Sequence, residues 1–400
     1  MGRTQLPKRR QNLNKSFKDV ANVNYRIPVA EPDISENELK SVIKAVKSGW
    51  ISSKGPFVEE FEEKFSSYIG LEYGISASNG TAALHLALAA LEIKHGDEVI
   101  VPALTFASVA NVVIYMGAKP VFVDSHPKYW CIDPSKLEEK ITKRTRAIIL
   151  VHLYGHPCDM DPTMKITKDY NLHVIEDCAE AHGAKYKGRK VGTFGDIACF
   201  SFYGNKIITT GEGGMCLTKN EELAKKIRMF RDHGMDPKKK YWHQVIGFNY
   251  RMTNLQAALG VAQLEKIDKF VEKKRKIAKT YNTFLKNVQG VTLHPEMPWA
   301  KNVYWLYSIL IGAKKYGISR DDLMEKLAQK GIETRPFFYP MHIMPPYKRY
   351  AINYHFPVAE KLSSSGINLP SSVKLKEEEI HEIAQLINLQ HVHHPRAKRK

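Results

Sequence analysis

A single lysine, Lys206, stands in a loop that follows an apolar, strand-like segment at residues 196–202. Asp177 ends another strand-like segment earlier in the chain. A lysine amine bonds to an aldehyde when its pKa falls below its usual value of about 10.4, and a carboxylate can keep a pyridine nitrogen protonated. Taken singly, the two residues also fit a solvated loop lysine and a turn aspartate. Together they predict a site for pyridoxal 5'-phosphate, an aldehyde built on a pyridine ring.

The phosphate of such a cofactor needs backbone N–H groups at the start of a helix. Residues 77–84 provide a strand end, a turn and a helix opening, where Gly80 allows close approach and Thr81 adds a hydroxyl group. A plain turn with a helix cap would have the same sequence. Ser201 offers a second hydroxyl group. Phe106, after the next strand, could stack on the pyridine ring or pack in the core.

The elements that carry these residues alternate between strand-like and helix-like patterns. A capping-box pattern at residues 35–38 opens a helix that runs to about residue 48, and apolar spacing predicts another over residues 57–68. Strands are predicted at residues 74–77, 98–101, 121–123, 147–152, 173–176, 196–202 and 214–217, with helices from residue 81 and over residues 107–116. Such alternation is typical of a mainly parallel sheet covered by helices on both faces.

A long helix-compatible stretch, residues 253 to about 288, marks the passage into a second region. That region contains a predicted strand at residues 303–312 and predicted helices at residues 319–330 and 378–389. We therefore predict an α/β fold with a large and a smaller α+β domain. The predicted divisions are a basic N-terminal arm at 1–26, a large cofactor-binding domain at 27–265, a small C-terminal domain at 266–390 and a basic tail at 391–400.

The chain carries a formal charge of +18, which would suit a polyanion-binding protein. More than half of that charge lies in residues 1–26 and 391–400, so the body is only modestly basic. The two ends fit solvated segments or a contact with an acidic partner. Neither contains a helix-turn-helix pattern, and we expect no nucleic-acid partner.

The composition, 43% hydrophobic and 26% charged over 400 residues, is sufficient for a full core. The longest apolar runs have the length of strands, so no membrane span is expected, and the N-terminus lacks the apolar centre of a secretory signal. The 5 cysteines are scattered without a Cys-x-x-Cys spacing, which predicts neither a disulfide framework nor a metal site. We expect a cytoplasmic protein.

Several motifs in a fixed order resemble the nucleotide-sugar aminotransferases, which are pyridoxal phosphate enzymes of fold type I. These motifs lie at residues 78–84, 102–106, 176–183, 192–196, 201–206 and 211–214, and the resemblance covers about residues 27–389. Four further segments resemble the subgroup of GDP-perosamine synthases. They lie at residues 48–53, 241–243, 249–254 and 335–340.

The resemblance implies a role for each matching residue. The implied cofactor-binding residues are Gly80, Thr81, Phe106, Asp177, Glu180, Ser201, Lys206 and Asn249. Lys206 would hold the cofactor covalently and move a proton, and Asp177 would face the pyridine nitrogen. Asn249 would complete the phosphate site of a neighbouring subunit, which implies a homodimer with shared active sites. Glu180 stands where much of the family has glutamine near the phenolic oxygen of the cofactor, a departure that fits the subgroup.

The implied reaction takes an amino group from L-glutamate, through the pyridoxamine phosphate form of the cofactor, to C4 of a nucleotide-linked 4-keto-6-deoxy sugar. GDP-4-keto-6-deoxy-D-mannose, converted to GDP-perosamine, is the favoured substrate. Candidates for binding its diphosphate are Arg251, Arg335, Tyr339 and His342. The alternatives are a UDP-sugar 4-aminotransferase, a sugar 3-aminotransferase and a non-catalytic binding protein of this fold. A dehydratase branch has histidine at the lysine position, and Lys206 argues against it.

Overall fold

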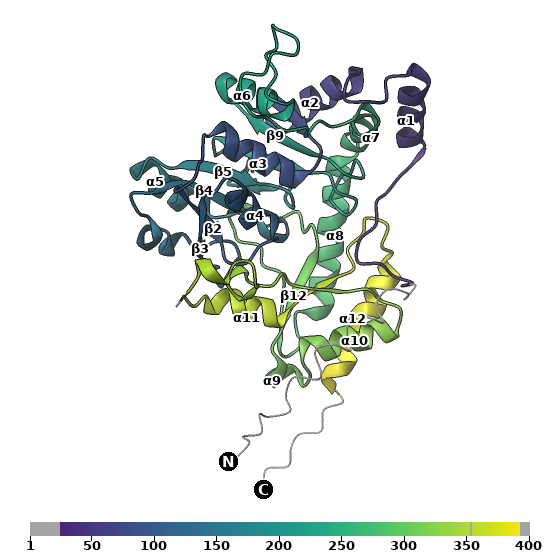
Figure 1. Cartoon of the computed structure of the whole chain (residues 1–400). Helices are drawn as coiled ribbons and strands as arrows, with labels where there is room; N and C mark the ends of the chain where they lie inside the picture. Colours follow the sequence, from purple (N-terminus) through teal and green to yellow (C-terminus); the bar gives the residue numbers. More distant parts are fainter. Residues whose placement is uncertain (1–24, 353, 393–400) are drawn as a thin grey trace, which may run out of the picture.

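The computed structural model describes residues 25–352 and 354–392 (Figure 1). The predicted basic arm and tail therefore lie almost wholly outside the described residues. Buried apolar side chains form two clusters, one around a seven-stranded sheet and the other around a four-stranded sheet. The domain boundary near residue 265 stays a prediction.

The large sheet is mixed and mainly parallel, as the alternating pattern predicted. Its strands are β1 (Tyr73–Ala77), β2 (Glu98–Pro102), β3 (Lys119–Val123), β4 (Thr145–Val151), β5 (His173–Asp177), β8 (Ile197–Ser201) and β9 (Gly214–Thr218). They lie in the order β1-β9-β8-β5-β4-β2-β3. Strand β9 is antiparallel to both of its neighbours, and the remaining pairs are parallel. The carboxyl ends of the parallel strands consequently meet at one edge of the sheet.

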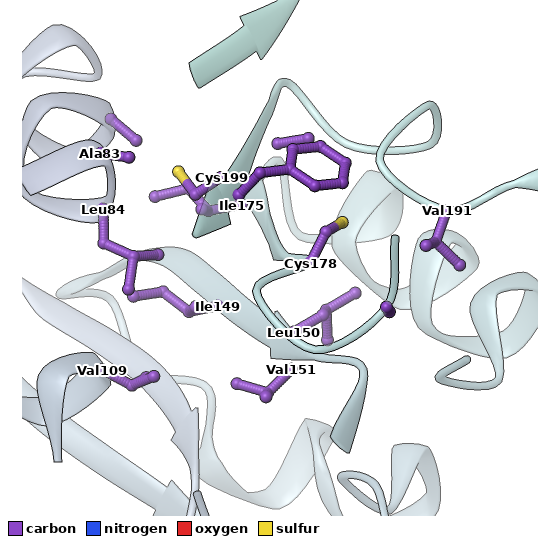
Figure 2. Packing of buried hydrophobic residues seen from close by; sticks show 14 of the residues in the cluster. Ala83, Leu84, Val109, Ile149, Leu150, Val151, Ile175, Cys178, Val191 and Cys199 are labelled. Atoms are coloured by element: carbon purple, nitrogen blue, oxygen red, sulfur yellow. The ribbon is translucent and has the colours of Figure 1, made fainter. Parts of the chain in front are cut away.

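Helices cover this sheet because its central strands are apolar on both faces. The helices of this part are α1 (Glu36–Ser48), α2 (Pro56–Ile69), α3 (Gly80–Ala90), α4 (Ser108–Tyr115), α5 (Met160–Asp169), α6 (Glu221–Arg231) and α7 (Asn254–Leu264). Helix α3 is buried along almost its whole length. In Figure 2, Leu84 of α3 points toward Ile149 of β4. This packing fixes the start of α3 relative to the sheet edge.

Two helices replace the single long stretch predicted from residue 253 onward. Helix α7 ends at Leu264, and α8 (Ile267–Leu285) begins after a break at Glu265 and Lys266. The Lys266 ammonium forms an ion pair with the buried carboxylate of Glu38 and donates to the Asp33 carbonyl at 3.2 Å. This contact joins the break to the start of α1. Helix α8 then runs on toward the second sheet (Figure 1).

The second sheet is antiparallel and has the order β10-β12-β14-β13. Its strands are β10 (Val291–Thr292), β12 (Tyr307–Ile311), β13 (Arg335–Pro336) and β14 (Gly366–Leu369), and the nearby helices are α9 (Ala313–Tyr316), α10 (Arg320–Gln329), α11 (Pro357–Ser365) and α12 (Glu377–Val392). A small third sheet contains β6 (Lys185–Tyr186), β7 (Arg189–Lys190) and β11 (Ala300–Lys301). Helices α10 and α12 correspond to the two helices predicted here.

The strand predicted at residues 303–312 is shorter than expected, because β12 begins only at Tyr307. Tyr304 has a left-handed backbone with φ of 50°, and its N–H donates to the Asn302 side chain at 2.7 Å. The chain therefore turns before it enters the sheet. Within the described ranges, no helix combines the length and the hydropathy that a membrane crossing requires.

Candidate active site

A cavity of about 680 Å³ lies at the carboxyl ends of the parallel strands. This volume is typical of small-molecule sites, and the strand ends are where α/β sheets bind their ligands. The cavity is lined by the start of α3, by the ends of β5 and β8, and by residues of the second region such as Trp305 and Arg335. Both parts of the chain therefore contribute to it.

Lys206 lies in the loop between β8 and β9 and lines this cavity. Its peptide N–H donates to the Tyr203 carbonyl at 2.9 Å, and its amine lies 3.9 Å from the centre of the Trp305 ring. Burial lowers the pKa of Lys206, while the charges of Glu180 and Asp177 act in the opposite direction. A lowered pKa favours the neutral amine, which is the form that attacks an aldehyde.

Two buried carboxyl groups share the cavity with that amine. Asp177 ends β5 and accepts a hydrogen bond from the Ala179 N–H at 3.0 Å, while burial raises its pKa. Glu180 accepts from the Tyr154 N–H at 2.6 Å, and burial raises its pKa to about 7. The Lys206 charge acts against both increases in pKa. Glu180 thus changes charge near neutral pH.

Behind Asp177, its neighbour Glu176 anchors β5 through hydrogen bonds to its fully buried carboxylate. The Glu176 carboxylate accepts three backbone N–H groups, each at 2.7 Å, from Gly192, Phe194 and Gly195. The Nδ1 of His152 accepts from the Cys158 N–H at 3.0 Å, so Nε2 carries the proton that faces Glu176 at 3.2 Å. The His152 peptide N–H donates to the Asp177 carbonyl at 3.2 Å. This network holds Asp177 in place.

The start of α3 forms the other end of the site. Asn79 caps the helix by accepting from the Ala82 N–H at 2.8 Å, and Gly80, Thr81 and Ser201 line the cavity. A Cβ on Gly80 would lie only 2.8 Å from the Ser201 Cβ, so the helix packs directly on the end of β8. The first turn of a helix leaves N–H groups without helical partners, which favours an anion.

These features fit pyridoxal phosphate. A reactive amine and two carboxyl groups lie in a cavity whose other end offers a helix N-terminus and a serine hydroxyl group. The close contact at Gly80 leaves no space there for a larger side chain. The residues present therefore match the aldehyde, the pyridine ring and the phosphate of this group.

Two other residues predicted from the sequence also line the cavity. Phe106 is 58% exposed, and its ring centre lies 5.7 Å from that of Phe338. Its exposure favours a role in stacking over a role in the core. Arg335 reaches the cavity and pairs with Glu333 at 3.1 Å.

The remaining predicted residues do not line this cavity. Arg251 pairs with Asp232, and the Nε2 of His342 lies 2.9 Å from a Glu360 oxygen. Tyr339 and Asn249 are exposed. Their roles toward substrate and cofactor stay predictions.

Trp305 and Tyr154 were missed from the sequence although both line the site. The Trp305 indole covers the Lys206 amine and donates from Nε1 to the Asn205 carbonyl at 2.8 Å. Trp305 lies within a run of apolar residues that resembles a strand, and such a run carries no sign of a site residue. The contact of Tyr154 with Glu180 uses a backbone N–H, for which no side-chain type gives a signal.

Comparison with known proteins places these features in a family. The family model of the DegT/DnrJ/EryC1/StrS aminotransferases matches residues 32–388. The chain belongs to this family. Its aminotransferases depend on pyridoxal phosphate, so the enzyme class, the fold and the cofactor predicted from the motifs are confirmed.

Curated relatives and solved structures agree with this assignment. The GDP-perosamine synthase of Escherichia coli O157:H7 is 49% identical over 90% of this chain and 98% of its own length. The GDP-perosamine synthase of Caulobacter vibrioides is 47% identical over 90% of this chain and 96% of its own. The crystal structure of the aminotransferase TlmJ from Streptoalloteichus hindustanus superposes with a TM-score of 0.86 at 28% identity, covering 91% and 98% of the two chains.

Proposed function

We propose that this enzyme transfers an amino group from L-glutamate to C4 of GDP-4-keto-6-deoxy-D-mannose and thereby forms GDP-perosamine. The observation that carries the proposal is the amine of Lys206, held beside two buried carboxyl groups in a cavity at the strand ends. The choice of sugar is supported by the 49% identity to a GDP-perosamine synthase over 90% of the chain.

Pyridoxal phosphate, when bound, supplies an aldehyde that exchanges for an amine and a ring that withdraws electrons from the reacting carbon. Lys206 would hold that aldehyde. Its Nζ, once free of that bond, would take a proton from the cofactor as a base and deliver it to C4 of the sugar as an acid. Asp177 would keep the pyridine nitrogen protonated from the end of β5. Gly80, Thr81 and Ser201 would hold the phosphate at the start of α3.

Trp305 and the second region would exclude water from the reacting atoms, because the indole is only 5% exposed and covers the amine. Arg335, at the cavity wall, is the strongest candidate for the substrate diphosphate, since a guanidinium group binds phosphate oxygens in pairs. Arg251, Tyr339 and His342 stay candidates that would need a neighbouring subunit or a movement to reach the substrate.

We also propose that two copies of the chain form a homodimer with shared active sites. The support lies in the loop between α6 and α7, which stands out from the molecule in Figure 1 (teal). This loop exposes large apolar side chains, with Tyr241 at 76% and Ile246 at 92%, and Asn249 is exposed near its end. Exposed apolar side chains in one place are typical of interfaces. The five buried, unpaired cysteines support a reducing, cytoplasmic location.

The test begins with purified protein and added pyridoxal phosphate. Borohydride should fix the cofactor on the peptide that contains Lys206, as seen by mass spectrometry. Glutamate is then supplied with either GDP-4-keto-6-deoxymannose or UDP-4-keto-6-deoxyglucose, and the mass of the product is measured by mass spectrometry. We expect the amino sugar from the GDP compound. Turnover of the UDP compound alone would overturn the choice of substrate, and the absence of an adduct would favour a non-catalytic protein.

A further inference from the structure

Lys274 is a buried lysine that the proposed reaction does not use. It lies on α8 with 4% of its surface exposed, and no carboxylate forms an ion pair with it among the described residues. Its amine donates to the Trp305 carbonyl at 3.0 Å and to the Ser371 carbonyl at 2.9 Å. Burying an amine without an opposite charge is costly, so a lysine at this position calls for a purpose.

The two carbonyl groups belong to segments that are far apart in the sequence. Trp305 lies before β12, and Ser371 follows β14. Ser371 is itself anchored, because its N–H donates to the Val29 carbonyl at 3.0 Å and its Oγ accepts from the Tyr307 N–H at 3.1 Å. Lys274 thus ties the main chain at Trp305 to a fixed point of the second region.

Trp305 carries this constraint to the active site. Its indole lies 3.9 Å from the Lys206 amine, measured to the ring centre, and it donates to the carbonyl of Asn205, next to Lys206. Lys206, Asn205 and Lys274 also line one small cavity, so Lys274 lies close to the segment that carries the catalytic amine. The backbone around Trp305 is tightly confined, because a Cβ on Gly155 would lie 2.9 Å from the Trp305 nitrogen.

We propose that Lys274 is a positioning residue for the catalytic amine: by holding the main chain at Trp305, it keeps the indole ring over Lys206. The proposal rests on the proposed function only for the catalytic role of Lys206. Burial lowers the pKa of Lys274 to about 7, yet a neutral amine still has two N–H donors for the two carbonyl groups. The contact therefore persists in either charge state.

The test measures access to the Lys206 amine in cofactor-free protein. Trace acetic anhydride at pH 8 labels lysines, and the Lys206 peptide is compared by mass spectrometry with that of the exposed Lys314. Lys274→Met should free the indole and raise the labelling of Lys206 by about threefold or more. In the reconstituted enzyme, kcat should fall by about tenfold with little change in KM for glutamate, since small misplacements of catalytic groups slow the chemical step.

Tyr281→Phe provides a matched control on the same helix. Tyr281 is buried and donates to the Pro370 carbonyl at 3.0 Å, beside Ser371, and its ring stacks on that of Tyr307. The Tyr281→Phe variant should leave the labelling of Lys206 unchanged. Equal effects of the two variants would reduce Lys274 to a structural residue and overturn the proposal.

A double-mutant cycle with Trp305→Ala decides whether the effect passes through the indole. In that background, Lys274→Met should cause no further rise in the labelling rate of Lys206. A rise as large as the one it causes in the wild-type background would overturn the proposal. If Lys274→Met fails to fold, two other variants serve instead. Lys274→Arg keeps N–H donors and should leave the labelling rate of Lys206 at the wild-type value, while Lys274→Gln, whose side chain is shorter, should raise that rate. The reverse order of the two rates would overturn the proposal. Because labelling needs no substrate, it separates this proposal from an error in the choice of sugar.

Discussion

At the scale of single residues, the site depends on an amine whose charge is set by its surroundings. Lys206 lies between two buried carboxyl groups and an indole ring, and burial lowers its pKa. Lys206→Ala should abolish the borohydride adduct and reduce turnover by about a thousandfold or more, since the residue both holds the cofactor and transfers the proton. The absorbance of the protein-bound cofactor after borohydride treatment measures the first effect, and the turnover rate measures the second. An adduct on another lysine would assign the role elsewhere.

The raised pKa of Glu180 predicts how the stability of the protein depends on pH. Its pKa is raised by burial from 4.5 to about 7, so the folded protein binds this proton more tightly than the unfolded chain does. The stability that it contributes is complete below about pH 4.5 and is lost as the pH rises through about 7. Glu180→Gln should remove this loss, which is on the order of 2 kcal/mol in the free energy of unfolding between pH 5 and pH 8.

Denaturant unfolding of the cofactor-free protein at the two pH values measures this difference. Glu325→Gln, an exposed position on α10, is the control and should behave like the wild type. If the Glu180 variant kept the wild-type dependence on pH, the carboxyl group would not be the group that titrates.

At the scale of elements, the start of α3 must touch the end of β8 for the phosphate to be held. Gly80→Ala would place a Cβ 2.8 Å from the Ser201 Cβ and push the two apart. Overpacking of this kind costs about 1–3 kcal/mol, so we expect cofactor affinity to fall by about tenfold or more. Equilibrium dialysis with pyridoxal phosphate measures it.

Gly204→Ala is the control for that change. A Cβ on Gly204 would meet no atom within 4 Å, although the residue lies in the same loop as Lys206. Its cofactor affinity should stay at the wild-type value. A similar loss in both variants would show that the loop, rather than the contact between Gly80 and Ser201, limits binding.

Local patterns explain which elements could be predicted from the sequence. The capping box of Ser35 and Glu38 and the alternation of strands and helices are encoded within a few residues, and the structure contains them. The break at Lys266, which has a distant partner in Glu38, and the turn at Tyr304, which has an uncommon backbone angle, follow no such local pattern. The placement of Trp305 over Lys206 likewise depends on Lys274, and no local pattern reports such a contact.

At the scale of the whole molecule, the exposed loop between α6 and α7 bears on how many chains make one active site. Asn249 is exposed and does not line the cavity of its own chain. If it completes the phosphate site of a second copy, Asn249→Ala should weaken activity at sites that contain an intact Lys206. Light scattering should first show a particle of twice the chain mass of 45.6 kDa.

Mixed dimers then distinguish a shared site from two separate ones. One chain carries Lys206→Ala and the other Asn249→Ala, and both are produced together with different tags. In a mixed dimer with shared sites, one site lacks both residues while the other has both, so random pairing should restore about a quarter of the wild-type activity per chain. With separate sites, the mixture would show only the average of the two variants, and Asn249 would then act within its own chain or not at all.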